Sequence, residues 1–574
     1  MSRRFIYNKK SNYKNNIRIN GITKLQALIL ANRDIIDNNT VDMFINPDLS
    51  KLHDPFLLND MDKAIDIIAE SMENNEKIRI FGDYDQDGIS SVTTLVEGIS
   101  YFYDNIDYDI PDRVTDGYGV SFNMVKKAKE DGVKLVITCD NGISAFDEID
   151  LLKKEGIKVI LTDHHQIKKE EKDGWIDQIL PNADAVINPK RLDSTYPFDD
   201  LCGAGVSFKL IEALFITLGG EDEYLYSLLE YVAMGTVCDI VSLVDENRIF
   251  VKEGLRRINN TSKLGIKALL DANSWNKEVD SYTLGFVIGP CINATGRLSS
   301  AKFAVEMLLE DDKDRAYEYA RNLVELNKER KILTENGLDT AISIIEENNL
   351  SKDDIIVVYC PDIEESICGI VAGRIKEKYQ RPAIVLSNSS EENIAKGSGR
   401  SIEAYDIYSE IFPYSDNLVS FGGHPMACGL SIEIDKIDDF RKFLNDNSKL
   451  QESDFEEIIN IDVKLDISKL SLEFAESLSD LRPFGKSNPK PVFADKDISI
   501  KSIRMLGKNK DTMKIVFSKN NRDLNSIKFF AKDDYEYIKD NYNKGKRKFD
   551  IVYYPDINEY KGVKTLQLRM IDIR

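Results

Sequence analysis

The chain has 574 residues but no long apolar run, only seven cysteines and only four histidines. No apolar stretch approaches the roughly 18 residues of a membrane-spanning helix. The basic start, MSRRFIYNKKSNYKNN, has neither the apolar segment nor the small-residue cleavage site of a signal peptide. The cysteines are scattered without a CxxC pair, which favours buried, reduced thiols over disulfides or zinc ligands. We therefore expect a cytoplasmic protein with no membrane segment.

Internal repeats and low-complexity tracts are absent as well. With 42% hydrophobic and 30% charged residues the composition is that of a globular protein, and the length requires several hydrophobic cores. The net charge of −22 argues against a nucleic-acid partner. The charge is uneven, however, because residues 491–574 hold 19 Lys/Arg and 12 Asp/Glu, a net +7 that leaves −29 for the rest. A basic C-terminal module is compatible with nucleic-acid binding, and a solvated basic face is the alternative.

The first half of the chain alternates short apolar, β-branched runs with amphipathic segments. The runs at residues 78–81, 133–138, 157–162 and 183–188 predict strands, and the segments between them predict helices. Such alternation indicates a parallel sheet with crossover helices. Ligands bind such sheets at the carboxyl ends of the strands. Polar motifs follow three of these runs directly, which indicates a single site.

The second half has a different pattern. Residues 311–349 predict a helix that would span about 55–60 Å if unbroken, with Gly337 as a candidate interruption. A second α/β segment follows at residues 354–387, and glycine-rich turns are expected at 396–401 and 420–430. Beyond about residue 455, short alternating runs predict a small β-barrel or sandwich.

The residues suited to catalysis gather in four motifs. They are Asp83, Asp85 and Asp87 in FGDYDQDGIS, Asp140 in TCDNGIS, Asp163, His164 and His165 in LTDHH, and Asp239 in GTVCDIVSL. Each motif alone is weak. The first resembles a calcium loop, but Thr94 stands where an EF-hand needs its bidentate glutamate. DNG is a common turn, and a lone His-His pair is more often structural than a ligand.

Taken together, these motifs predict a metal site. Carboxylates with one or two imidazoles suit Mn²⁺ or Mg²⁺ better than they suit thiolate-bound zinc. Several carboxylates, one of them bridging, would hold two ions about 3.5–4 Å apart, an arrangement that promotes phosphoryl displacement. Unrelated turns remain the alternative.

The four motifs resemble those of the DHH phosphoesterase superfamily. Further segments resemble the RecJ family of single-strand-specific DNA exonucleases, from about residue 20 to the end of the chain. They include PDRVTDGYGVS, LCGAGVSFKL, INATGRL, GIVAGRI, GSGRS, FGGHPMACGL, LRPFGKSNPKPVF and LQLRMIDIR. The resemblance is specific because many spaced motifs agree in order.

The resemblance implies a 5′→3′ exonuclease that uses two Mn²⁺ or Mg²⁺ ions to release mononucleotides from single-stranded DNA in repair and recombination. The implied metal ligands are Asp83, Asp85, Asp140, His164 and Asp239, with Asp140 as the bridging carboxylate. His165 would complete the metal shell or contact the phosphate. Asp87 and Asp163 would orient the imidazole or a loop amide, with a turn and a helix cap as the structural alternatives.

A 5′ exonuclease also needs a site for the strand terminus, and arginine binds phosphate oxygens bidentately. The residues that match the family positions for the 5′-phosphate or DNA are Arg113, Arg297, Ser398, Arg400, Gly422, Gly423 and His424. A structural salt bridge is the alternative role for Arg297, and a tight turn is the alternative for the glycines.

The implied fold is a multidomain α/β protein. The expected parts are an N-terminal extension (1–50), a parallel-sheet DHH catalytic domain (51–265), a helical connector (266–350), a smaller α/β DHH-associated domain (351–455) and a C-terminal OB-fold barrel (456–574). Aromatic residues in the barrel could stack on bases, although alternation should bury about half of them. They are Phe517, Phe529, Phe530, Tyr553, Tyr554 and Tyr560.

Two departures from the family pattern stand out: Glu364 replaces a histidine in the second α/β segment, and Met513 replaces a histidine in the barrel. Neither belongs to the proposed metal site, so we expect activity. The alternatives are a DHH phosphodiesterase for short oligoribonucleotides or cyclic dinucleotides, and an inactive scaffold. The family also implies a monomer that works with a helicase and a single-strand-binding protein.

Overall fold

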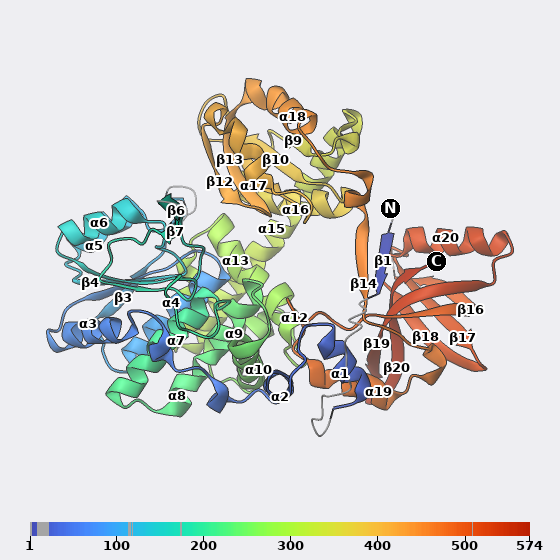
Figure 1. Cartoon of the computed structure of the whole chain (residues 1–574), viewed down its shortest axis with the longest axis horizontal. Helices are drawn as coiled ribbons and strands as arrows, with labels where there is room; N and C mark the ends of the chain where they lie inside the picture. Colours follow the sequence, from blue (N-terminus) through green and yellow to red (C-terminus); the bar gives the residue numbers. More distant parts are fainter. Residues whose placement is uncertain (1–2, 8–21, 113–115, 118, 173–174, 508) are drawn as a thin grey trace.

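The computed structural model describes residues 3–7, 22–112, 116–117, 119–172, 175–507 and 509–574. It has three lobes: a large α/β body, a smaller α/β domain and a β-barrel (Figure 1). The long helix α15 (Lys313–Glu347) leads from the body to the smaller domain, and strand β14 (Glu457–Ile461) leads from there towards the barrel (Figure 1).

The body is built on five parallel strands in the order β3-β2-β4-β5-β8. They are β2 (Ile78–Phe81), β3 (Ile106–Asp109), β4 (Leu135–Cys139), β5 (Lys158–Thr162) and β8 (Ala185–Ile187). Side chains alternate between the faces, so that Ile80 joins one hydrophobic cluster and Phe81 another. The predicted parallel sheet is confirmed. The prediction omits β3, because its sequence IDYD is too polar to show a strand pattern.

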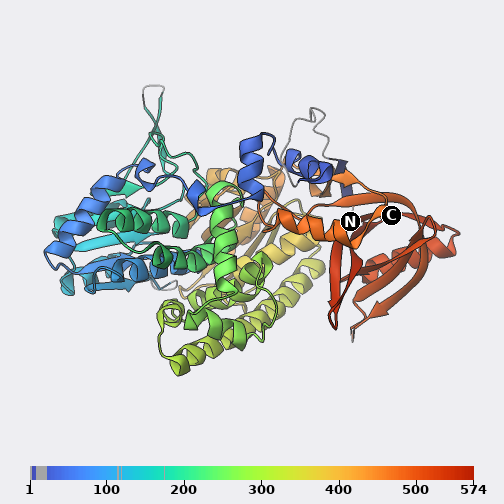
Figure 2. The same ribbon diagram turned by 90° about the horizontal axis from the view of Figure 1, so that it is seen from below.

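Helices cover both faces of this sheet (Figure 2). The Ile80 face packs against α3 (Met61–Glu73), α4 (Gln86–Ser100) and α7 (Gly203–Leu218). The Phe81 face packs against α5 (Phe122–Glu130) and α6 (Phe146–Lys154). A hairpin of β6 (Lys169–Lys172) and β7 (Trp175–Gln178) projects from the body (Figure 2). Because all five strands are parallel, the loops after β2, β4 and β5 lie at one edge of the sheet.

The rest of the body is helical, and its last helix is the long α15. The helices before it are α8 (Asp222–Ser227), α9 (Leu229–Cys238), α10 (Asp245–Ile258), α11 (Leu264–Ala272), α12 (Ser281–Thr283), α13 (Gly289–Leu298) and α14 (Lys302–Leu309). The expected interruption of α15 at Gly337 is wrong, because the helix continues for 35 residues. A Cβ at Gly337 would lie 3.1 Å from Ile367 Cδ1, so this glycine permits close packing against the smaller domain.

The smaller domain has a five-stranded sheet in the order β12-β13-β11-β10-β9. Its strands are β9 (Ile356–Tyr359), β10 (Ala383–Asn388), β11 (Ile394–Arg400), β12 (Ser420–His424) and β13 (Ala427–Glu433), and its helices are α16 (Cys368–Tyr379), α17 (Ile407–Ile411) and α18 (Ile437–Asp446). The glycine-rich segments predicted as turns are thus mostly strands. A Cβ at Gly397 would lie 1.9 Å from Val385 O, so this glycine allows two strand backbones to approach.

The C-terminal strands close into a barrel in the order β16-β17-β18-β20-β19, with β19 pairing back to β16. They are β16 (Phe493–Leu506), β17 (Thr512–Lys519), β18 (Arg522–Lys528), β19 (Lys548–Tyr560) and β20 (Val563–Ile573), accompanied by β15 (Val463–Lys464), α19 (Leu472–Ser477) and α20 (Lys532–Asn543). Met513 lies in the barrel core. The barrel buries half of the six aromatics, as its alternation predicts: Phe517, Tyr553 and Tyr554 are buried, and Phe529, Phe530 and Tyr560 are exposed.

The N-terminal segment packs with the C-terminal barrel. Strand β1 (Arg3–Tyr7) pairs with β14 in parallel. Helices α1 (Lys24–Ala31) and α2 (Asn38–Ile45) contribute apolar side chains such as Leu30 and Phe44 to the barrel core. The chain therefore runs from the barrel to the body, on to the smaller domain and back to the barrel. The domain limits derived from the sequence stay a prediction.

The seven cysteines are all free thiols, and six of them are buried, as their apolar surroundings predict. Burial raises the pKa of the Cys360 thiol to about 12 and that of the Cys428 thiol to about 11, which keeps both protonated at neutral pH. Among the helices of the described residues, none is long and apolar enough to cross a membrane.

Arg248 joins the body to the N-terminal and C-terminal segments. Its side chain on α10 is fully buried and donates to the backbone oxygens of Phe44, Arg482 and Pro483. The guanidinium also lies 3.6 Å from the centre of the Phe44 ring. Burial lowers the pKa of Arg248 to about 9, and the nearby charge of Arg33 adds to this shift. We call this set of contacts the Arg248 clasp.

His53 connects the segment before α3 to the start of α10. Its Nε2 lies 2.7 Å from Asp245 Oδ1, and its backbone N–H donates to Glu246 Oε1 over 2.7 Å. The hydrogen bond to Asp245 raises the pKa of His53; Glu246 adds to the rise, whereas burial and the charge of Lys209 oppose it. Because the pKa of His53 is higher in the folded than in the unfolded protein, its contact with Asp245 stabilises the fold fully below the unfolded pKa of about 6.5. This stabilisation is lost as the pH rises through the folded pKa.

Replacing His53 by glutamine is expected to lower the free energy of unfolding by about 1 kcal/mol near pH 5.5 and by less near pH 9. Glutamine still donates to Asp245 but does not titrate. Urea unfolding of both proteins at the two pH values measures this difference. An equal loss at both values would contradict the titration of His53.

Candidate metal centre

The four acidic and histidine motifs meet at the carboxyl edge of the parallel sheet. Asp83 and Asp85 follow β2, Asp140 follows β4, and the segment from Asp163 to His165 follows β5. Asp239 comes from a different direction, at the C-terminal end of α9. Three overlapping groups offer ligand atoms that all lie within 4.8 Å of one another: Asp83, Asp85 and Asp140; Asp140, His164 and His165; and Asp87, His164 and Asp239.

The loop after β2 is held by the first turn of α4. Asp85 caps this helix, since its Oδ1 accepts from the backbone N–H groups of Asp87 (2.9 Å) and Gly88 (3.2 Å). A Cβ at Gly88 would lie 2.5 Å from Asp83 O, so the glycine allows the loop to fold tightly over the helix. As a result, Asp83 is buried in the site while Asp85 lies at its exposed side.

Asp140 occupies the centre of the cluster in an unusual backbone conformation. Its φ is +59°, in the left-handed region, and its side chain is buried. A Cβ at Gly203, the first residue of α7, would lie 2.6 Å from Asp140 Cβ. Non-glycine residues held in this region concentrate at functional sites. The glycine at the start of α7 therefore makes room for the Asp140 carboxylate.

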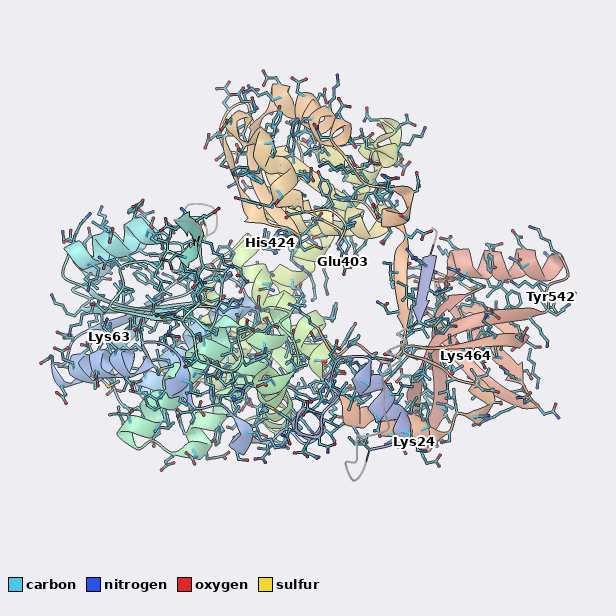
Figure 3. The ribbon with its side chains drawn as sticks, viewed as in Figure 1. Lys24, Lys63, Glu403, His424, Lys464 and Tyr542 are labelled. Carbon is cyan, nitrogen blue, oxygen red and sulfur yellow. The ribbon has the colours of Figure 1, made fainter. Side chains whose placement is uncertain are left out.

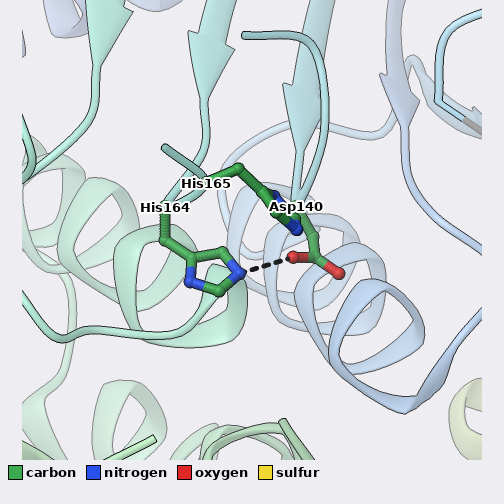
Figure 4. A group of neighbouring side chains, drawn as sticks. All are labelled: Asp140, His164 and His165. Atoms are coloured by element: carbon green, nitrogen blue, oxygen red, sulfur yellow. Dashed lines mark ion pairs between the residues drawn. The ribbon is translucent and has the colours of Figure 1, made fainter. Parts of the chain in front are cut away.

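His164 faces three carboxylates. Its Nε2 lies 3.1 Å from Asp140 Oδ1 (Figure 4), 3.7 Å from Asp87 Oδ2 and 3.8 Å from Asp239 Oδ2. The residue is 6% exposed, and within the described chain neither ring nitrogen makes a hydrogen bond. Burial lowers the pKa of His164, which favours the neutral imidazole that binds metals. Buried polar atoms without hydrogen bonds need an explanation, and a metal ion supplies one.

Asp163 organises the turn that carries both histidines. Its Oδ1 accepts from the backbone N–H groups of His164 (2.7 Å) and His165 (3.0 Å) and lies 2.7 Å from His165 Nδ1, while its Oδ2 accepts from Ile143 N over 3.0 Å. Burial opposes ionisation of Asp163, but the hydrogen bond and charge of His165 lower its pKa to about 2. Asp163 thus fixes the His165 ring, which lies beside Asp140 (Figure 4).

Asp87 serves the next helix as well as the cluster. Its two carboxylate oxygens accept from the first N–H groups of α7, at Gly203 (2.6 Å) and Ala204 (3.0 Å). Asp87 is therefore not only a turn residue, the structural alternative that the sequence left open. It also holds the start of α7 against the cluster of carboxylates and histidines. Burial, with the charge of Asp85, raises the pKa of Asp87 to about 6.

The electrostatics of the cluster favour a cation. Burial raises the pKa of Asp140 well above its ordinary value, and the neighbouring carboxylates raise it further. Burial and Asp87 raise the pKa of Asp239 to about 7. Several carboxylates brought this close repel one another unless positive charge lies among them. Oxygen ligands with an imidazole fit Mn²⁺ or Mg²⁺.

Three of the predicted terminus-binding residues meet at the start of α16. Arg297, in the last turn of α13, donates to Ser366 O over 2.7 Å. A Cβ at Gly369 would lie 2.8 Å from Arg400 Nη2 and 3.4 Å from Ser398 Oγ, so both side chains of β11 approach the same helix turn. Two guanidinium groups and a helix N-terminus form a positive region between the body and the smaller domain.

The GGH segment lies on the edge strand β12 of the smaller domain. Gly422, Gly423 and His424 are all exposed, and His424 lies on the side of this domain that faces the body (Figure 3). Gly423 has a φ of +151°, and a Cβ there would lie 2.4 Å from Ala427 O. Although His424 is exposed, its partial desolvation and the charge of Arg400 lower its pKa. Arg113 lies outside the described residues.

One residue of the site region, Asn293, was not singled out by sequence reasoning. Asn293 accepts from Gln86 N over 2.7 Å and so holds the start of α4. It belongs to the INATGRL motif, in which only the arginine suggested a chemical role. Glu364 is exposed just before α16, and its neighbour Glu365 forms an ion pair with Lys396 at 2.8 Å. The lysine on β11 thus pairs with Glu365, the neighbour of the replacing residue Glu364.

Comparison with known proteins places these domains in one family. Family models match residues 77–236 (DHH family, N-terminal domain), 352–449 (DHHA1 domain) and 461–572 (RecJ OB domain). The chain is 34% identical over 554 residues to the single-stranded-DNA-specific exonuclease RecJ of Bacillus subtilis strain 168, covering 96% of this chain and 68% of that protein. The chain belongs to the RecJ family. The Escherichia coli K12 RecJ is also 34% identical, over 89% of each chain.

Solved RecJ structures share the fold. A crystal structure of RecJ with Mn²⁺ from Thermus thermophilus matches with a TM-score of 0.79 at 24% identity, covering 95% of this chain and 75% of that one. A crystal structure of an exonuclease RecJ bound to manganese matches with a TM-score of 0.59 at 29% identity, covering 70% and 96%. The predicted DHH, DHH-associated and OB-fold architecture is confirmed.

Proposed function

We propose that this chain is a metal-dependent exonuclease that degrades single-stranded DNA from the 5′ end and releases mononucleotides. The cluster of five aspartates and two histidines carries this proposal, together with Arg297 and Arg400 at the contact between the body and the smaller domain. The curated RecJ relatives are named single-stranded-DNA-specific exonucleases, which supports the substrate. The basic barrel and its exposed aromatics agree with a nucleic-acid partner.

The residues that would hold two divalent ions are Asp83, Asp85, Asp140, His164 and Asp239. Asp140 belongs to two of the three ligand groups, which makes it the best candidate for the shared carboxylate. When bound, Mn²⁺ or Mg²⁺ supplies Lewis acidity that lowers the pKa of water and neutralises charge on phosphoryl oxygens.

The remaining residues of the site orient the substrate. Asp163 fixes the His165 ring beside Asp140, which supports a role for His165 in contacting the phosphate that is cleaved. Asp87 anchors α7 and so keeps Gly203 against Asp140. These positions restrict the motion of the groups that surround the reacting phosphorus.

The polarity follows from the positive region at the start of α16. Arg297, Ser398 and Arg400 would bind a terminal phosphate, with Arg113 and the Gly422–His424 segment as further contacts. Arginine forks and a helix N-terminus both favour phosphate. A site that holds the 5′-phosphate next to the metal centre would place the first phosphodiester bond at the metals, one nucleotide from the end.

Single-stranded DNA labelled at either end tests this function. With Mn²⁺, loss of single nucleotides from the 5′ end is expected, and a 5′-hydroxyl strand should be cleaved more slowly than a 5′-phosphate strand. Cleavage confined to RNA of two to about five nucleotides, or to cyclic dinucleotides, would instead favour a DHH phosphodiesterase. Cleavage from the 3′ end would contradict the role of the arginine region.

The cellular compartment, the oligomeric state and the protein partners of the enzyme are a further part of the proposal. Seven free thiols suit the reducing cytoplasm. A monomer that works with a helicase and a single-strand-binding protein stays a prediction from the family. Sedimentation of the purified chain, alone and with each partner, tests it.

A further inference from the structure

An ion pair on the smaller domain borders the positive region at the start of α16. Glu365 Oε1 lies 2.8 Å from Lys396 Nζ, and the two side chains are 40% and 44% exposed. Glu365 opens the short 3-10 helix η5 (Glu365–Ile367), which leads directly into α16, and Lys396 lies on β11. The roles assigned above to the metal centre and to the strand terminus use neither residue, so the purpose of this pair is open.

Strand β11 places Lys396 in one row with two residues of the terminus site, the name we give to Arg297, Ser398 and Arg400. Burial alternates along β11, so that these three alternate side chains are partly exposed while the glycines between them are buried. Alternate side chains of a strand lie on the same face of the sheet. Helix α16 packs against β11 on this face, where Ser398 and Arg400 reach Gly369 and Lys396 reaches Glu365. Lys396 is therefore a further cation beside the terminus site.

Glu365 brings a negative charge into the same region. The next residue, Ser366, accepts a hydrogen bond from Arg297 through its backbone oxygen over 2.7 Å. The Glu365 carboxylate thus lies at the edge of the region formed by Arg297, Arg400 and the N-terminus of α16. A carboxylate there repels a phosphate, and it also neutralises Lys396. Both effects weaken phosphate binding, so this residue opposes the affinity that the arginines supply.

The pair is built to exchange partners. Ion pairs this exposed contribute little to stability, and the lysine stem is long and flexible. A terminal phosphate carries close to two negative charges at pH 7, whereas a carboxylate carries one. A phosphate in the terminus site therefore draws Lys396 away from Glu365, and Lys396 returns to Glu365 when the phosphate leaves.

We propose that Glu365 competes with the 5′-phosphate for Lys396 and so promotes release of the mononucleotide after each cleavage. This inference rests on the proposed function, because it concerns the product of that reaction. Hydrolysis joins the oxygen of water to phosphorus, breaks the bond from phosphorus to the 3′-oxygen, and leaves a proton on that oxygen. The released mononucleotide therefore keeps the 5′-phosphate that the terminus site holds.

This product must leave before the shortened strand can advance, and product release limits the rate of many enzymes. When the mononucleotide leaves, Lys396 regains an ion pair with Glu365 instead of losing its partner. The carboxylate thus lowers the free-energy cost of release. Glu365 is a positioning residue in this scheme, because it acts on the phosphate through Lys396.

Binding in EDTA tests the exchange apart from catalysis. The probes are oligothymidylates of about 20 nucleotides with a 3′ fluorophore and either a 5′-phosphate or a 5′-hydroxyl. Glu365→Gln is expected to bind the 5′-phosphate strand roughly 2- to 5-fold more tightly, the range that an exposed ion pair allows, and the 5′-hydroxyl strand unchanged. In a Lys396→Met background the same change should gain less, because no lysine is left to be freed. An equal gain in both backgrounds would show that Glu365 acts by repulsion alone and would overturn the exchange.

Product inhibition tests the role in release. With Mn²⁺ and a 5′-phosphate strand, thymidine 5′-monophosphate should inhibit Glu365→Gln at roughly 2- to 5-fold lower concentration than wild type, and kcat and KM should fall together. Unchanged inhibition would overturn the proposal.

Glu155→Gln is the matched control. Glu155 forms a comparable surface pair with Lys129 at 2.6 Å but directly precedes β5, at the edge of the sheet opposite the metal centre. This variant should match wild type in binding and in inhibition. Unaltered circular dichroism shows that each variant folds.

The same samples separate this inference from the proposed function. If wild-type protein cleaves single-stranded DNA from the 5′ end but Glu365→Gln binds and is inhibited as wild type is, the function stands and the role of Glu365 falls. If wild-type protein binds 5′-phosphate and 5′-hydroxyl strands equally, the terminus site falls and this inference falls with it. If wild-type protein cleaves no DNA, the function falls, and the release step falls with it.

Discussion

Replacing Asp140 by alanine is expected to reduce hydrolysis of single-stranded DNA by on the order of 10³-fold or more, about 4 kcal/mol of transition-state stabilisation. Asp140 belongs to two of the three ligand groups, so its loss affects the whole cluster. The metal-free protein should be no less stable, because burial and neighbouring carboxylates already raise the pKa of Asp140 well above its ordinary value. Removing this carboxylate relieves a repulsion that only a cation offsets.

Thermal unfolding with and without Mn²⁺ separates these effects. For the wild-type protein, Mn²⁺ at about 100 times its dissociation constant should add about 2.7 kcal/mol to the free energy of unfolding. Asp140→Ala should lose most of this gain. Asp147→Ala, at an exposed position in the first turn of α6, is the control and should keep both activity and the Mn²⁺ effect. A full Mn²⁺ effect in Asp140→Ala would remove Asp140 from the ligand set.

The sequence predicted the sheet because burial on both faces demands continuous apolar, β-branched strands. Polar residues directly after such strands must lie at the edge where parallel strands end. Asp83, Asp140 and His164 could therefore be brought together without coordinates. Asp239 was a candidate as the carboxylate of the fourth motif, but no strand pattern placed it beside the others, since it follows the helix α9 and its approach to His164 depends on helix packing.

Other features depend on contacts that no local pattern records. The glycines of β11 were predicted to form a turn. In the structure they allow two neighbouring strands to approach closely, as at Gly397, and no local sequence pattern indicates this role. The contact of Arg297 with Ser366 joins two domains, and nothing near either residue indicates the other. The packing of α1 and α2 against the barrel is likewise invisible in the sequence, because their apolar faces fit any hydrophobic surface.

Replacing Arg248 by methionine is expected to cost about 3–5 kcal/mol, although Arg248 touches no part of the metal centre. The guanidinium is the donor for the backbone oxygens of Phe44, Arg482 and Pro483. Methionine fills the space but donates nothing, so three carbonyl oxygens lose this partner, two of them in buried hydrogen bonds. Scanning calorimetry should show the barrel, with α1 and α2, unfolding at a lower temperature than the body. Lys252→Met, on the next turn of α10, removes a single exposed contact to Ile45 O and should change little.

The Arg248 clasp also makes a prediction about DNA. Two of its carbonyl partners begin the segment 482–490, which forms one wall of a groove of about 1340 Å³ lined by Arg256, Arg482, Lys486 and Lys490. Because basic side chains attract the DNA backbone, loosening that wall should weaken binding of a single strand of about 20 nucleotides in EDTA. Arg248 itself is fully buried and cannot contact DNA. Unchanged affinity together with the loss of stability would show that the clasp holds the domains together without shaping the groove. Unchanged stability would show that water or a small backbone shift satisfies the three carbonyl groups, which would contradict the clasp itself.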